Sequence, residues 1–346
     1  MKRKMKKMLS MILALAIVLS SVGFESNAAS FSNRRKQFDK MYIPYALNEM
    51  YNLIEDSHVS YASKTKLRKS ELTPKQKKYY EYFAKKFENL EDFYISDESD
   101  SYKKRDYKCS AYTCFLDDHP EYKLCCDTVN ETTESGKVIC HHYFKTPSGK
   151  RVKTAKDKKA LKKYIKSLIS TRESVADHII EMMPENLSTI DKYRYLAVVL
   201  CYSTKYNQTY YDNHTNYSRV AKSEVWRNAS TKDGPLLYGT AVCSGYSEAY
   251  KYLCNRAGLY CETVIGQPKK IGTGGHEWNI VKLKSGTYYV DVTWMDTLWT
   301  SNINYNHFIV TEKEMRQNHS EFTWSGKVTG KKSYRKIIEK VVNPEV

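Results

Sequence analysis

Between residues 243 and 294 the spacing of apolar residues changes from that of a helix to that of strands. The segment 243–256 places apolar residues at intervals of three and four, so that one stripe of a helix can be buried. That stripe contains Tyr246, Ala249, Tyr250 and Leu253. Gly258 follows as a helix terminator. Three strand candidates come next, at 261–266, 276–283 and 287–294. A helix followed by a strand and a hairpin predicts an α+β domain.

Cys243 stands in the first turn of this helix, within the sequence TAVCSGYSEA. The unpaired N–H groups and the positive end of the helix dipole favour an anion there, and a thiolate is such an anion. The thiolate is also the nucleophilic form of cysteine. Gly245 removes side-chain bulk two residues later, and we expect a substrate to approach there. The position therefore favours a reactive thiol.

A reactive thiol needs a base to take its proton, and the base needs a group that orients it. His276 and Asp291, on the two strands of the hairpin, are the candidates. A two-residue turn at 285–286 would place them on one face, but four residues or about 13 Å apart along the strands. Direct opposition requires a wider loop over 282–285 or a bulge.

The order of these motifs resembles the transglutaminase-like superfamily, in the branch of secreted bacterial proteins related to kyphoscoliosis peptidase and the cytokinesis-protein transglutaminase-like domains. The resemblance covers about 185–315. Its strongest segments are AVCSGYSEAYKYLCNRAGL (241–259), HEWNIVKL (276–283) and YYVDVTW (288–294). Weaker matches are NQTYYDN (207–213), the aromatic strand YNHFIVTEKEM (305–315) and AYTCFLDDHPEYKL (111–124).

The resemblance implies a papain-like transglutaminase core, with the nucleophile helix packed on an antiparallel sheet. It implies Cys243 as nucleophile, His276 as general base and then acid, and Asp291 as the orienting carboxylate. Trp278 and Trp294 would shape the substrate site beside Gly245. The mechanism requires neither a metal nor another cofactor. A second donor for the oxyanion is not identifiable from the sequence.

Ordinary structural roles compete with these assignments. Cysteine is among the most buried residue types, and a histidine or aspartate is often a satisfied core residue. Cys254 and Cys261 have no base nearby in sequence, so we expect both to pack in the core. We expect His307 to be structural.

The first 29 residues have the features of a secretory signal peptide. Basic residues precede an apolar run from Met8 to Val18, and small residues follow up to Ala29. About eleven apolar residues are too few to span a bilayer. We therefore expect a soluble extracellular protein, without a stable membrane span after signal cleavage. Removing residues 1–28 takes five positive and one negative charge from the net +17, leaving +13.

A basic exported protein attracts polyanions. Association with anionic cell-wall polymers is thus one expectation, and a solvated lysine-rich surface without a partner is the alternative. No nucleic-acid-binding motif is present, and we expect no nucleic-acid partner.

The region before the core is predicted to be mainly helical. Helices are expected over 38–55, 73–90, 157–183 and 189–205, a strand over 138–144 and a polar loop over 97–108. The expected organisation is a signal peptide (1–29), a mainly helical N-terminal region (30–170), a transglutaminase-like catalytic domain (171–320) and a C-terminal extension (321–346).

Nine cysteines are an odd number for an exported chain, so at least one is free or paired with another molecule. Five lie between 109 and 140 and could form disulfides of undetermined connectivity. A zinc site is the alternative, although two adjacent cysteines do not have the usual C-x-x-C spacing. Its ligands would come from Cys125, Cys126, Cys140, His141 and His142.

Together these features predict a secreted, cysteine-dependent acyl-transfer enzyme acting on peptide or glutamine carboxamide bonds through a thioester. Hydrolysis, by a protease or deamidase, is slightly favoured over transamidation. The alternative is a catalytically inactive transglutaminase-like module for surface binding or adhesion.

Overall fold

The structure is a computed structural model that describes residues 68–96, 102–123, 125–146, 149–213, 228–269, 275–296, 303–320, 322 and 328–334. The expected signal peptide and the helix expected over 38–55 lie outside these residues. The described residues up to Glu173 form one compact unit, and those from Ser174 onward form a second, with Asn228 assigned to the first. The division falls within helix α5 (Ala155–Glu181).

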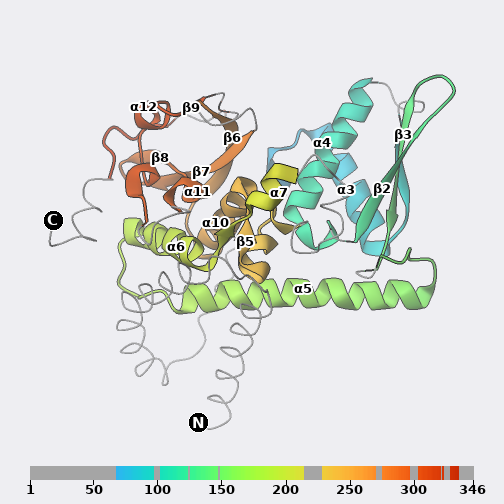
Figure 1. The fold of residues 1–346 in the computed structure, drawn as a ribbon, viewed down its shortest axis with the longest axis horizontal. Helices are drawn as coiled ribbons and strands as arrows, with labels where there is room; N and C mark the ends of the chain where they lie inside the picture. The colour runs from blue at the N-terminus through green and yellow to red at the C-terminus, as the bar shows by residue number, and fades with distance from the viewer. Residues whose placement is uncertain are drawn as a thin grey trace, which may run out of the picture. The chain divides into compact units, whose positions relative to one another are not determined.

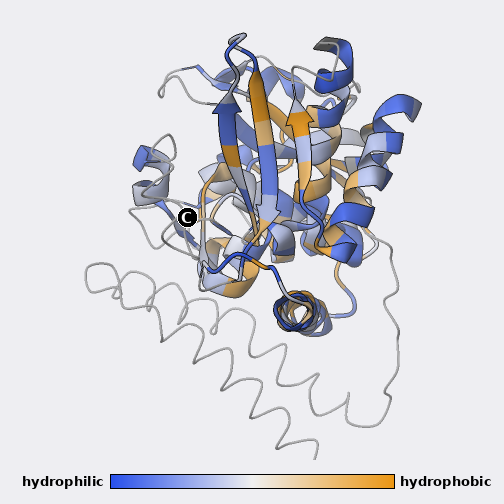
Figure 2. Ribbon diagram, turned by 90° about the vertical axis from the view of Figure 1, so that its right-hand side faces the viewer, coloured by the Kyte–Doolittle hydropathy of each residue, from blue (hydrophilic) through white to orange (hydrophobic). Residues whose placement is uncertain are grey.

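The N-terminal unit packs helices against a small antiparallel sheet. Its helices are η1 (Arg68–Glu71), α3 (Pro74–Asn89), α4 (Tyr102–Asp118), η2 (Pro120–Tyr122) and the first part of α5. Its strands are β1 (Phe93–Ser96), β2 (Cys126–Thr132) and β3 (Val138–Phe144), in the order β1-β3-β2. A core rich in phenylalanine, including Phe83, Phe87 and Phe115, joins the layers. Figure 2 shows that β2 is mostly hydrophilic, whereas β3 carries more hydrophobic residues.

Local sequence signals located α3 and β3 correctly. Thr73 is the N-cap of α3 and forms a capping box with Gln76, with Pro74 in the first turn. The loop predicted over 97–108 is wrong for its second part, because α4 begins at Tyr102. The sequence analysis also missed β1 and β2, which pair with β3 on either side. The N-terminal unit therefore contains a sheet as well as helices.

The C-terminal unit has the α+β fold that the sequence predicts. After α5 come α6 (Thr189–Ser203), β4 (Lys205–Tyr206), α7 (Gln208–Asn213), η3 (Gly234–Tyr238), β5 (Thr240–Ala241) and α10 (Cys243–Arg256). The chain continues through β6 (Cys261–Pro268), β7 (His276–Leu283), β8 (Gly286–Val290), α11 (Val292–Met295), η4 (Tyr305–His307), α12 (Glu312–Met315) and β9 (His319–Ser320). The main sheet is antiparallel, in the order β8-β7-β6-β9, and α10 contacts β6 and β7 (Figure 1).

Helix α10 is fixed against this sheet by its buried stripe and by hydrogen bonds to β7. Tyr246, Ala249, Tyr250 and Leu253 are all fully buried, as predicted. Ser247 Oγ donates to the Glu277 carbonyl at 2.7 Å, and Asn279 Nδ2 donates to the Ser247 carbonyl at 3.0 Å. The start of α10 is thereby held near the start of β7.

The end of α10 also agrees with the sequence. Gly258 has a φ of +75° after the helix, and the Leu259 N–H donates to the Cys254 carbonyl at 2.8 Å. This is a Schellman-type termination, for which glycine is favoured. Cys254 and Cys261 are both buried, in agreement with the packing role expected of them.

The register of the β7–β8 hairpin differs from both sequence alternatives. Leu283 pairs with Gly286, so the two-residue turn is at 284–285 rather than 285–286. In this register position 276 would face 293, which puts Asp291 two residues from direct opposition instead of four or none. Such diagonal neighbours are about 7–8 Å apart, within reach of long side chains. No wide loop is needed.

The segment 305–315 is a short helical turn, an isolated bridge and a second short helix, rather than the aromatic strand expected. Val310 makes the bridge, to Tyr289 on β8. Within the described ranges, no helix has the length and apolar character needed to cross a membrane.

Candidate active site

Cys243 is the first residue of α10 and carries a partly exposed free thiol. Its N-cap residue, Val242, has no side-chain oxygen and makes no side-chain cap. Valine is a poor N-cap for this reason. The side chain of residue 242 therefore does not cap the N–H groups of the first turn.

Gly245 has a different neighbour from the one expected. It is buried, and a Cβ at this position would lie 2.3 Å from the Ala229 carbonyl oxygen and 2.9 Å from the Ala241 Cβ. Val242 N–H donates to the same carbonyl at 2.9 Å. The glycine thus lets the backbone around Ala229 pack against α10.

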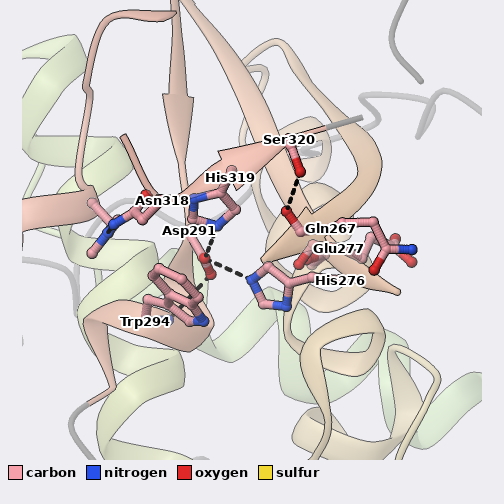
Figure 3. Close-up of polar contacts among 10 residues, drawn as sticks. Gln267, His276, Glu277, Asp291, Trp294, Asn318, His319 and Ser320 are labelled. Carbon is pink, nitrogen blue, oxygen red and sulfur yellow. Dashed lines mark hydrogen bonds and ion pairs between the residues drawn. The ribbon is translucent and has the colours of Figure 1, made fainter. Parts of the chain in front are cut away.

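His276 begins β7 and is buried. Its Nε2 lies 2.8 Å from Asp291 Oδ2, a bond that Figure 3 shows. The Cys243 side chain is near enough to the same ring to raise the pKa of His276. Nε2 faces Asp291, so Nδ1 is the ring nitrogen that does not take part in this bond. The structure thus joins His276 to Asp291 and places the Cys243 side chain near the same imidazole.

His276 and Asp291 shift each other's pKa values. Burial by itself lowers the pKa of His276, but the charge and hydrogen bond of Asp291, assisted by Cys243, raise it to about 10. Burial would raise the pKa of Asp291, but the two neighbouring histidines hold it well below its usual range. The arrangement therefore favours an imidazolium next to a carboxylate.

Asp291 follows β8 and is the N-cap of α11. Its Oδ1 accepts the Trp294 N–H at 3.1 Å, and its own N–H donates to the His307 carbonyl at 2.9 Å. Oδ2 is left for the histidines. The side chain is fully buried, so these bonds fix its position.

His319 is a further member of the site that the sequence analysis did not identify. Its Nε2 lies 3.2 Å from Asp291 Oδ2, and since a carboxylate only accepts, the His319 N–H donates. Its Nδ1 lies 2.7 Å from Asn318 Oδ1, and Asn318 Nδ2 is 2.8 Å from His307 Nε2. No local sequence signal marks His319, because it lies in the two-residue strand β9, where it pairs with Pro268 of β6.

The two tryptophans enclose the histidines. Trp278 is fully buried, with its ring centroid 5.7 Å from that of His276 and 4.7 Å from that of His319. Trp294 is partly exposed, at 5.4 Å and 4.3 Å from the same two rings. Of the two, only Trp294, which lies beside Asp291 and His319 in Figure 3, has side-chain surface that a substrate could touch.

Tyr206 on β4 is another residue that sequence reasoning missed. Its pKa is raised by burial and by the proximity of the Cys243 side chain. The phenol therefore remains a hydrogen-bond donor at neutral pH.

One group of metal-ligating side chains comes together in the described part of the chain: His276, Asp291 and His319, with ligand atoms within 4.8 Å of one another. A divalent ion could bind these atoms only by replacing the two hydrogen bonds to Asp291. The cysteines and histidines of the alternative zinc site, between 125 and 142, form no such group.

Comparisons with known proteins give a distant likeness. No family model matches the chain. Human kyphoscoliosis peptidase is 26% identical over 157 residues, covering 41% of this chain and 22% of that protein. The mouse protein of the same name is 26% identical over 137 residues, covering 37% and 19%. The chain thus matches about a fifth of the length of these relatives. A crystal structure of a TGase aligns with a TM-score of 0.31 and 16% identity, over 49% of this chain and 44% of that one. The chain is similar, at this distance, to the transglutaminase-like superfamily.

Proposed function

We propose that this transglutaminase-like protein is a cysteine-dependent acyl-transfer enzyme acting on peptide or glutamine carboxamide bonds. The observation that supports the proposal is the hydrogen bond between His276 Nε2 and Asp291, with the partly exposed Cys243 near enough to raise the pKa of the same imidazole. A nucleophile, a base and an orienting carboxylate in this relation can carry out acyl transfer.

In the proposed reaction, the Cys243 thiol gives its proton to His276, and the thiolate attacks the carbonyl carbon of the substrate. We assign the oxyanion to the first-turn N–H groups of α10, which Val242 does not cap, and to the hydroxyl of Tyr206, whose pKa the nearby Cys243 raises. His276 then protonates the leaving amine as the C–N bond breaks, which leaves a thioester on Cys243. Water or an amine, deprotonated by His276, attacks the thioester and frees the thiol.

Hydrolysis is the preferred outcome, because the curated relatives are called peptidases. We further propose that the protein is exported, since residues 1–29 have the features of a secretory signal peptide. The second candidate is an inactive module that binds a surface through its positive charge. It is favoured only by the charge of +17 and not by the arrangement of the site.

The test is the rate at which iodoacetamide labels each cysteine, followed by mass spectrometry of the native protein. We expect Cys243 to react far faster than the buried Cys254 and Cys261 at pH 7, because His276 takes its proton. In His276→Ala this advantage should disappear at pH 7 and return only at alkaline pH.

Activity is measured in parallel, as ammonia release from a glutamine peptide and as cleavage of a peptide library. Cys243→Ala should abolish both. If Cys243 reacts no faster than Cys126, and the wild-type protein turns over neither substrate, the enzyme proposal is wrong and the binding module takes its place.

A further inference from the structure

The N-terminal unit contains a hollow of about 630 Å³ between α3 and α4 that no step of the proposed reaction uses. Helix α3 supplies Lys75, Lys78, Tyr79 and Tyr82, which are spaced i, i+3, i+4 and i+7 and so share one face. Helix α4 supplies Lys103, Lys104, Tyr107 and Lys108. The described residues of the lining are all lysines and tyrosines.

Two of these lysines stand where a positive charge is unfavourable. Lys75 and Lys103 are each the second residue of their helix, and neither helix has an acidic residue in its first turn. The helix dipole makes this end positive, so acidic side chains or bound anions are favoured there and lysines are not. Both helix ends and the lysines between them therefore add to one positive potential at the hollow.

The tyrosines give the hollow flat, partly apolar surfaces. The Lys108 ammonium lies 6.0 Å from the centre of the Tyr79 ring, and Tyr82 is one of the few large hydrophobic side chains left exposed. Rings of this kind pack against the C–H faces of sugars and polyols while neighbouring cations bind charged groups. The hollow thus combines an anion site with a stacking surface.

We propose that this hollow binds an anionic polymer in which sugar or polyol units are joined by phosphate. Its volume falls in the range of about 300–1000 Å³ that is usual for ligand sites, more than a single phosphate needs. A membrane surface fits less well, because amphipathic membrane-binding segments present protruding apolar side chains rather than a lysine-lined hollow. Among the described residues of the lining there is also no arginine, the residue that most often both pairs with phosphate and stacks on bases.

The proposal is independent of the acyl-transfer chemistry, since it involves residues of the N-terminal unit alone. It assigns polymer binding to the lysines that line this hollow rather than to the net charge of the whole chain. Three acidic residues, Asp97, Glu98 and Asp100, precede α4 in the sequence and carry a charge opposite to that of the lysines. Binding is therefore measured on the full chain, in which these residues are present.

The probe is soluble poly(glycerol phosphate), with binding measured by calorimetry between 50 mM and 500 mM salt. We expect affinity to fall as salt rises, and at fixed salt to fall at least tenfold in the double variant Lys75→Gln, Lys103→Gln. Tyr82→Ala should weaken binding without changing its salt dependence. The matched control, Lys162→Gln with Lys166→Gln, removes two exposed charges of α5 in the same unit and should change affinity less than twofold.

Circular dichroism checks that each variant folds, and iodoacetamide labelling of Cys243 checks the other unit. Equal losses in the control and hollow variants would overturn the proposal, because net charge would then explain binding. Tighter binding to phosphatidylglycerol vesicles or to a single-stranded oligonucleotide would overturn it too. So would full competition by equimolar inorganic phosphate, which would indicate a site for a single anion.

Discussion

His142 in the N-terminal unit and His276 in the C-terminal unit are both buried, yet their pKa values are shifted in opposite directions. Burial, with a smaller contribution from His141, lowers the pKa of His142 to about 4. Burial also acts against the charge of His276, but Asp291 and Cys243 raise its pKa to about 10.

The two pKa values differ because the two imidazoles have different neighbours, since both side chains are buried. His142 stacks on Phe93, with ring centroids 4.7 Å apart, and its Nδ1 lies 2.9 Å from the Thr128 hydroxyl. His276 has a buried carboxylate at 2.8 Å. A neutral imidazole in an aromatic core serves packing, whereas a charged imidazole beside a thiol can move protons.

Removing the carboxylate should make His276 resemble His142. In Asp291→Asn, burial is no longer opposed by a negative charge, so the pKa of His276 should fall below its ordinary value. At pH 7 the ring should then be neutral. We expect turnover to drop by roughly 10³- to 10⁴-fold, and the labelling of Cys243 at pH 7 to slow with it.

Both quantities are measured from pH 5 to 10. Asp177→Asn is the control, because it removes a carboxylate of the same unit that pairs with Arg256 away from the site. Unchanged labelling of Cys243 in Asp291→Asn would mean that the carboxylate does not set the state of the imidazole.

The two histidines should affect stability at opposite ends of the pH range. The pKa of His142 is about 4 in the fold and 6.5 when unfolded, so stability should be lost as pH falls from 6.5 towards 4. The difference corresponds to about 3 kcal/mol. His276 has the raised value, so its contribution is present below pH 6.5 and should be lost as pH rises towards 10.

Urea unfolding at pH 5, 7 and 9 measures both effects. His142→Phe should flatten the acidic side of the profile and leave the alkaline side unchanged, while His276→Gln should do the reverse. If His142→Phe keeps the full acidic loss, the buried imidazole is not its source.

A variant of Tyr206 tests whether the site also supplies a hydrogen-bond donor to the oxyanion. If its hydroxyl donates to the oxyanion, Tyr206→Phe should lower kcat about 10²-fold with little change in KM. Labelling of Cys243 by iodoacetamide forms no oxyanion and should be nearly unaffected. A parallel loss of labelling would assign Tyr206 to the state of the thiol instead.

His319 should have the smallest effect, because it acts on the site through Asp291. We expect His319→Leu to lower kcat about tenfold without changing KM, since Asp291 loses a donor that fixes its position. His319→Gln keeps an N–H donor and should restore most of the activity. A merely structural role would make both variants equally unstable in urea, with no rescue of kcat by glutamine.

Elements with local sequence signals could be predicted reliably. Thr73 and Pro74 marked the start of α3, Gly258 marked the end of α10, and the spacing of Tyr246 to Leu253 identified the buried face of α10. Prediction failed where the signal is not local. The polar residues at the start of α4 suggested a loop, although that helix is stabilised by contacts with α3 and β1.

The site shows the same division. Cys243, His276 and Asp291 could be proposed from the sequence because the order of the three motifs that contain them resembles that of the transglutaminase-like superfamily. The distances between them could not, because a shift of the turn from 285–286 to 284–285 changes every cross-strand pair. His319 was missed because its contact with Asp291 joins residues 28 positions apart through β9.

Local patterns were enough to predict the α+β class, the start of α3, the end of α10, and the residues at the start of α10 and of β7. Tertiary structure decided which of those groups meet, because hairpin register and the pairing of β9 with β6 depend on packing across the whole sheet. It also decided the charge of each buried histidine, since an imidazole in a protein core takes its protonation state from the neighbours that the fold provides.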